Sequence, residues 1–119
     1  MGDINHKAVL ATTWSDEVAN KIDAWIGNAD YVDPKYAHLF VEVVGVVNSY
    51  VTFVLAPCGS TEGWGTDLEH GLLREAFIEF LDSLAYDDGS SSVEYVEVLY
   101  GDYGQEIVKG NTYDVYEDE

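Results

Sequence analysis

The sequence predicts an α+β fold in which two helices pack on an antiparallel sheet of three to five strands. Two segments carry apolar residues at helical spacing, and others are rich in the Val and aromatic residues typical of strands. With 47% hydrophobic residues, the 119-residue chain has enough apolar material for one core. The predicted order is α-β-β-α-β with an optional last strand. Residues 1–119 are interpreted as one domain with a short acidic tail at about 114–119.

The first helix is predicted over residues 16–26. Ser15 is a suitable N-cap because its hydroxyl can accept a bond from a free amide of the first turn. Ile22, Trp25 and Ile26 then fall on one helical face. Gly27 is typical of a helix end. The following residues, 28–34, have no clear period and are expected to form a loop.

The second helix is predicted to begin at Thr66-Asp67-Leu68-Glu69, which has the spacing of a capping box. Its apolar residues recur at helical spacing and should form one wide stripe that docks on the sheet. The stripe consists of Leu68, Leu72, Leu73, Ala76, Phe77, Phe80, Leu81 and Leu84.

Residues 38–56 are predicted to form a β-hairpin that turns at Asn48-Ser49. Both strands are apolar nearly throughout, so a central position is expected, with one face on the helices and the other partly covered. A third strand is predicted over residues 93–100. Two short extended pieces, 106–109 and 113–116, follow it.

The charge is the most unusual property of the chain. There are 23 Asp and Glu against 5 Lys and Arg, for a net charge of -18 and a pI near 4.1. Direct binding to nucleic acid or to an anionic membrane is disfavoured, because both need positive charge on the protein. Residues 1–60 carry -4 and residues 61–119 carry -14. A basic protein partner is therefore favoured, and the second half should contact it.

No complete catalytic or metal-binding signature is present. Cys58 is the single cysteine, so an internal disulfide is excluded, and the histidines lack the short spacing of a zinc site. Cys58 and His70 could form a thiol-imidazole pair, but a lone Cys at a strand end is more often a small buried hydrophobe. We expect no catalytic residue, no metal and no cofactor. The lack of a signal peptide or membrane span favours the cytoplasm.

The candidate binding residues are carboxylates of the second half. Glu75 and Glu79, and Glu79 and Asp82, are helical neighbours, and Glu94 and Glu97 fall on opposite faces of a strand. The predicted acidic surface consists of Glu69, Glu75, Glu79, Asp82, Asp87, Asp88, Glu94, Glu97, Asp114 and Glu117. Trp64, between two glycines, is either an exposed aromatic anchor or folds back over the helix start.

These observations favour an acidic nucleic-acid mimic that occupies the basic groove of a nucleic-acid-binding enzyme and inhibits or regulates it. In charge and size alone, the chain resembles small phage-encoded inhibitors of restriction or CRISPR systems, which implies action in the host-cell cytoplasm. The alternatives are an acidic interaction module with a basic partner that binds no nucleic acid, a halophilic domain, and a small enzyme that uses surface carboxylates. An uneven charge distribution argues against the halophilic alternative.

Overall fold

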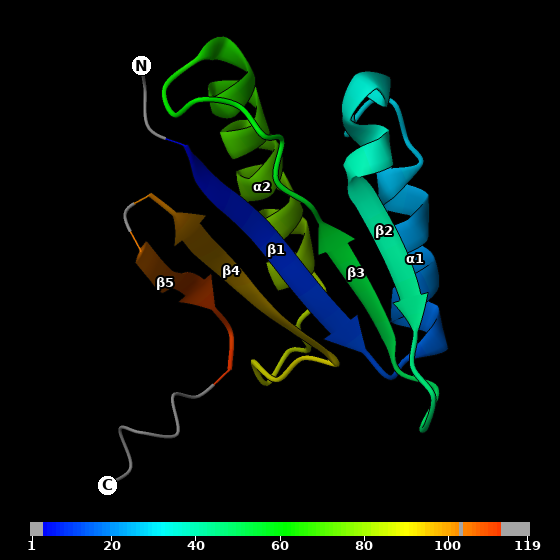
Figure 1. The fold of residues 1–119 in the computed structure, drawn as a ribbon. Coiled ribbons are helices and arrows are strands. Elements are labelled where there is room, and N and C mark those ends of the chain that lie inside the picture. The colour runs from blue at the N-terminus through cyan, green and yellow to red at the C-terminus, as the bar shows by residue number, and fades with distance from the viewer. Residues whose placement is uncertain (1–3, 103, 113–119) are drawn as a thin grey trace, which may run out of the picture.

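A computed structural model describes residues 4–102 and 104–112 of the chain. Helices separate the strands into three groups along the sequence, as Figure 1 shows. In order they are β1 (Asn5–Thr13), α1 (Asp16–Ile26), the 3₁₀ helix η1 (Pro34–Leu39), β2 (Phe40–Val44), β3 (Val51–Leu55), α2 (Gly65–Ser83), β4 (Val93–Gly101) and β5 (Gly104–Gly110).

The five strands form one antiparallel sheet in the order β2-β3-β1-β4-β5. Two split βαβ units interlock within it: β3 lies between β1 and β2, which α1 connects, and β1 lies between β3 and β4, which α2 connects. Both helices cover the same face of the sheet and lie behind it in Figure 1. The predicted α+β class with two helices on an antiparallel sheet is confirmed.

The predicted element order omits β1, which is the central strand of the sheet. β1 pairs with β3 from Val9 to Thr13 and with β4 from Asn5 to Thr13. Residues 8–11 are all apolar, so the segment lacks the two-residue alternation of a half-buried strand, and Ala8 and Ala11 have low strand propensity. Its place between two partners makes it a strand, because they satisfy its backbone groups on both sides.

The core lies between the sheet and the two helices. Trp25 of α1 stacks on Phe80 and Phe77 of α2, with ring centroids 5.3 and 5.6 Å apart. These rings join the two helices above the sheet. The largest fully buried side chains include Val9, Ile22, Phe53, Leu55, Phe77, Leu81 and Val93.

The hairpin turn at Asn48-Ser49 is confirmed. β2 ends at Val44 and β3 begins at Val51, and within this connection both residues have positive φ angles, 62° and 56°. The expected central position is wrong for β2, which forms an edge of the sheet. Four of its five residues are exposed, so its apolar composition does not reflect burial on two faces. The piece predicted at 106–109 is part of β5, whereas 113–116 and the acidic tail lie outside the described residues.

The start of α2 differs from the predicted capping box. The helix begins at Gly65 after Trp64, so Thr66 lies inside its first turn and no side chain caps the end. The Asp67 carboxylate instead accepts a bond of 2.9 Å from the Gly63 backbone N–H.

The predicted apolar stripe of α2 is correct from Leu73 onward, where every predicted residue is buried or partly buried. Phe77 and Leu81 are fully buried, but Leu68 and Leu72 are 61% and 67% exposed. Asp67, His70 and Arg74 take the buried positions instead, because polar groups on β1 and β4 provide them with partners. None of the helices in the described part of the chain is long and apolar enough to cross a membrane.

Candidate functional site: the acidic surface of the helical layer

The outer side of α2 carries two free-standing carboxylates. Phe77 and Leu81 face the sheet, so Glu75 and Glu79, one helical turn apart, lie toward solvent, and both are exposed. Asp82 is also exposed, but its carboxylate accepts a bond of 2.7 Å from the Tyr95 hydroxyl of β4. Burial and this carboxylate raise the pKa of Tyr95, which therefore remains a donor. Asp82 thus also has a structural role.

Asp87 and Asp88 follow α2 in an exposed loop. The Asp88 carboxylate accepts bonds from the hydroxyl and backbone N–H of Ser90, at 2.6 and 2.9 Å, and these bonds lower the pKa of Asp88. The loop borders a hollow of about 630 Å³ that is shared with Glu17 and Lys21 of α1. Glu17 was not among the predicted residues, and the fold brings it to Asp87 and Asp88.

A larger groove, of about 710 Å³, separates the outer sides of α1 and α2. Its aromatic lining includes Trp25, which stacks on Tyr31 at 5.8 Å with only 9° between the ring planes and on Phe80 from the other helix. Asp30 and Glu79 add carboxylates to this lining, and Lys21, which pairs with Glu17, adds one ammonium. The groove therefore offers flat aromatic faces beside two carboxylates and one paired cation.

These carboxylates form the helical acidic surface, a name used here for six exposed residues. They come from α1, the loop that follows it, α2 and the loop that ends α2. The residues are Glu17, Asp30, Glu75, Glu79, Asp87 and Asp88.

Several predicted residues lie elsewhere. Glu69 pairs with Lys35 at 3.2 Å and accepts a bond from Tyr36, and this pairing raises the pKa of Lys35. Glu94 is exposed on the sheet face that the helices leave uncovered, whereas Glu97 points under α2. Asp114 and Glu117 lie outside the described residues. The Trp64 side chain is 65% exposed at the start of α2, so it projects into solvent.

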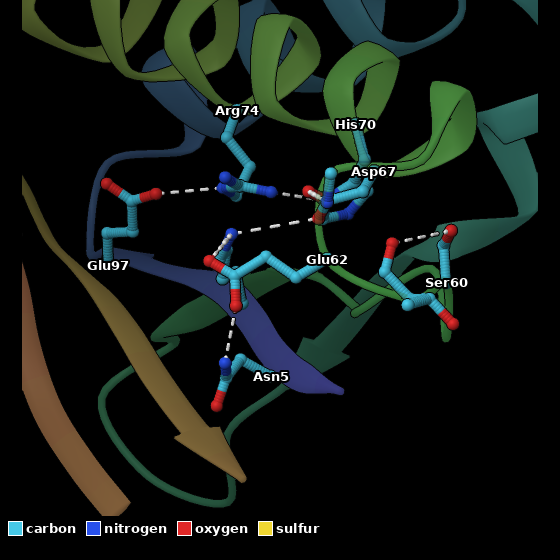
Figure 2. A network of polar contacts seen from close by, with 10 residues as sticks. Asn5, Ser60, Glu62, Asp67, His70, Arg74 and Glu97 are labelled. Atoms are coloured by element: carbon cyan, nitrogen blue, oxygen red, sulfur yellow. Dashed lines mark hydrogen bonds and ion pairs between the residues drawn. The ribbon is translucent and has the colours of Figure 1, made fainter. Parts of the chain in front are cut away.

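A network of polar side chains fills the space between the first half of α2 and strands β1 and β4 (Figure 2). Arg74 donates from Nε to Glu97 of β4 at 2.8 Å and from a terminal nitrogen to Nδ1 of His70. The opposite ring nitrogen, Nε2, donates to the Ala56 carbonyl oxygen at 2.9 Å. Since Nδ1 accepts a bond, the ring is neutral, in keeping with the burial that lowers the pKa of His70.

The second part of the network surrounds Lys7 of β1. Its ammonium lies 3.7 Å from carboxylate oxygens of both Glu62 and Asp67, and the Asn5 amide donates to Glu62 (Figure 2). Lys7 and Arg74 are thus held between α2 and the sheet. Lys21 and Lys35 pair with Glu17 and Glu69 at 3.4 and 3.2 Å. Four of the chain's 5 basic residues are therefore already paired. Because the 23 acidic residues far outnumber them, most carboxylates have no cation of this chain to pair with, and the surface potential is strongly negative.

The structure also tests two earlier hypotheses, a catalytic pair of Cys58 and His70 and a metal site. Both ring nitrogens of His70 are engaged, by Arg74 and by the backbone of Ala56, so neither is available to a Cys58 thiol. Cys58 is a half-buried free thiol. Within residues 4–102 and 104–112, no three His, Cys, Asp or Glu side chains are grouped as metal ligands would be.

Comparison with protein-family models, curated proteins and solved structures found no match. The functional conclusion therefore depends on the charge, the geometry and the exposed groups of this chain.

Proposed function

We propose that the protein is an acidic nucleic-acid mimic. The helical acidic surface occupies the positively charged nucleic-acid groove of another protein and so inhibits or regulates it, as anti-restriction and anti-CRISPR inhibitors do. The observation that carries the proposal is the gathering of exposed carboxylates from separate segments on one layer, while most cations are held in ion pairs.

A duplex mimic needs carboxylates from more than one segment of this chain. Side chains one helical turn apart, such as Glu75 and Glu79, stand roughly 5 to 6 Å apart, whereas a duplex carries about one charge per 1.7 Å of axis. One helix therefore presents a lower charge density than a duplex. The additional carboxylates of Glu17, Asp87 and Asp88 are needed to extend the negative surface across a groove.

The groove between α1 and α2 is a second feature that favours a basic partner. An Arg or Lys side chain can place its cation against the exposed ring of Tyr31 while Asp30 and Glu79 lie beside it. Such contacts contribute about 0.5 to 2 kcal/mol each. The groove would thus add an anchor to an interaction that is otherwise governed by distributed charge.

The test compares two variants of equal net charge. Glu75→Gln with Glu79→Gln removes two charges from the helical acidic surface, and Asp23→Asn with Glu106→Gln removes two exposed charges elsewhere. A partner is captured from a cell lysate, identified and purified, and its affinity for each variant is measured between about 0.05 and 0.5 M salt. We expect the first pair to weaken binding about tenfold, chiefly through slower association, and the second pair by less than about threefold.

Competition with nucleic acid distinguishes the mimic from an ordinary acidic interaction module. A mimic and a nucleic acid exclude each other from the partner, and raising the salt concentration weakens both complexes. Simultaneous binding of both, or a partner that binds no nucleic acid, would replace the mimic by the interaction module. If the two variants bind the partner with equal affinity, the helical acidic surface is not part of the interface.

A further inference from the structure

The face of the sheet opposite the helices is apolar and uncovered by any described element. Val9 and Ala11 of β1 are buried under the helices, so Ala8 and Leu10 point to the other side, which faces the viewer in Figure 1. In the register of the sheet, Leu10 lies opposite Val54 of β3 and Val96 of β4, and Val54 lies opposite Val41 of β2. One row of apolar side chains therefore crosses four strands. We call this the open face, defined by Leu10, Val41, Val43, Val54, Val96 and Val98.

The open face lacks the charge that dominates the rest of the molecule. Strand alternation assigns Glu94 to this side, and among the described strand residues it is the only carboxylate there. Glu94 lies opposite Thr12, near the end of β1. Leu10, Val41 and Val43 are 38%, 49% and 52% exposed. In a chain of net charge -18, so large an apolar and nearly uncharged area is typical of an interface.

Two hydroxyl groups of this face are already paired with each other. The hydroxyls of Thr12 and Thr52 share a hydrogen bond of 2.8 Å across β1 and β3. The His6 ring contacts the ring of Tyr100, with centroids 5.1 Å apart. A partner can therefore remove water from the Thr pair without leaving its hydroxyls unpartnered.

We propose that the open face is the interface of a homodimer, in which a second copy packs sheet to sheet about a two-fold axis. The five strands hold 35 residues in all. At about 4.8 Å between strands and about 3.3 Å per residue, they give a footprint of roughly 550 Å² per copy. Two copies together bury roughly 1,100 Å², just above the approximately 1,000 Å² that a specific interface requires. Because the open face is nearly uncharged, it is better suited to packing against the same face of a second copy than to binding the basic partner proposed for the helical acidic surface.

The charge of the two copies does not prevent this packing. Stacked sheets lie about 10 Å apart and a helix is about 10 Å across, so the helical acidic surfaces face outward on opposite sides, roughly 30 Å apart. That distance exceeds the Debye length of about 8 Å at physiological salt. Added salt should therefore leave the dimer unchanged or strengthen it, whereas it weakens binding to a basic groove.

Sedimentation equilibrium of the full chain tests the proposal. At about 10 to 100 µM, we expect a mass of twice 13.2 kDa, both at about 0.05 M and at about 0.5 M salt. Leu10→Glu buries an unpaired charge at the centre of the interface and should raise the dimer dissociation constant at least about 100-fold. Leu72→Glu, on an exposed position of α2, is the control and should remain dimeric.

Val43→Glu, on the edge strand β2, is a second variant and should destabilise the fold less than Leu10→Glu on the central strand. Circular dichroism verifies that each variant is folded. A wild-type monomer at about 100 µM overturns the proposal. If a Leu10→Cys thiol is protected from a maleimide in that monomer, with Cys58→Ser as background so that no other thiol reacts, another segment of the same chain covers the face. A dimer that persists in both glutamate variants places the interface elsewhere. None of these outcomes depends on the nucleic-acid-mimic function.

Discussion

Glu94 and Glu97 lie on the same strand, three residues apart, and have opposite roles. Glu94 is exposed on the open face, while Glu97 accepts a bond from Arg74 beneath α2. The alternation of a strand predicts that they face opposite sides, but it does not tell which of them is buried. The distinction depends on where α2 places Arg74, which is a property of the tertiary structure.

His70 should make stability depend on pH. Burial lowers its pKa in the folded protein below the value of about 6.5 of an unfolded chain. The folded state therefore binds fewer protons, so the stabilisation is complete above about pH 6.5 and is lost as the pH falls through the folded value. We expect the free energy of unfolding, measured by urea titration, to contain a component that decreases between about pH 7.5 and 5.

A matched pair of variants isolates that component, because protonation of the many carboxylates also changes stability. His70→Gln should remove the component, since its amide can still donate to the Ala56 carbonyl but does not titrate. His38→Gln, at an exposed position, should retain it. If both variants keep the wild-type slope, His70 is not the group that titrates.

At the scale of elements, α2 connects the core to the polar network. Its second half buries Phe77 and Leu81, and its first half buries Asp67, His70 and Arg74. Spacing alone predicted an apolar stripe that included Leu68 and Leu72, because polar residues are normally assigned to solvent. The network provides a partner for each buried polar group, and this reverses the usual assignment.

Phe77→Ala should cost about 3 to 5 kcal/mol of unfolding free energy, because the ring is fully buried and contacts Trp25 and Phe40. Leu72→Ala, on the same helix but 67% exposed, should change it by less than about 0.5 kcal/mol. Chemical denaturation of the two variants provides the comparison. A larger loss for Leu72 than for Phe77 would mean that the helix packs through the predicted stripe after all.

The sequence predicted both helices and the hairpin because each has a periodic pattern or a clear turn. It did not predict β1, whose apolar run does not alternate, or the edge position of β2, whose strand pairing depends on distant residues. The exposed carboxylates of α2 and its following loop were also predictable. Their association with Glu17 and Asp30 was not, since those residues are more than 40 positions away along the chain.

At the scale of the whole molecule, a net charge of -18 acts across a radius of gyration of 15.0 Å. At about 0.01 M salt the Debye length is about 30 Å, so all the carboxylates repel one another. At about 0.15 M it is about 8 Å, and only neighbours interact. We expect the protein to be folded even at about 0.01 M salt and its melting temperature to rise by a few degrees at about 0.15 M.

Thermal unfolding followed by circular dichroism at several salt concentrations measures this rise. The melting temperature of the Glu75→Gln, Glu79→Gln variant should increase less with salt, because this variant has less charge repulsion for the salt to screen. A chain that folds only in molar salt would instead support the halophilic interpretation of the acidity.

The central position of β1 has a consequence for how the chain folds. β1 leaves the ribosome before the other strands of this sheet, yet its partners are residues 51–55 and 93–101. Asn5, for example, pairs with Gly101. Until β4 has been synthesised, one edge of β1 remains without its native partner, so the sheet cannot be completed before residues 93–110 have been made. Closing such distant contacts slows folding, and the nascent chain exposes a strand edge to which other chains can add.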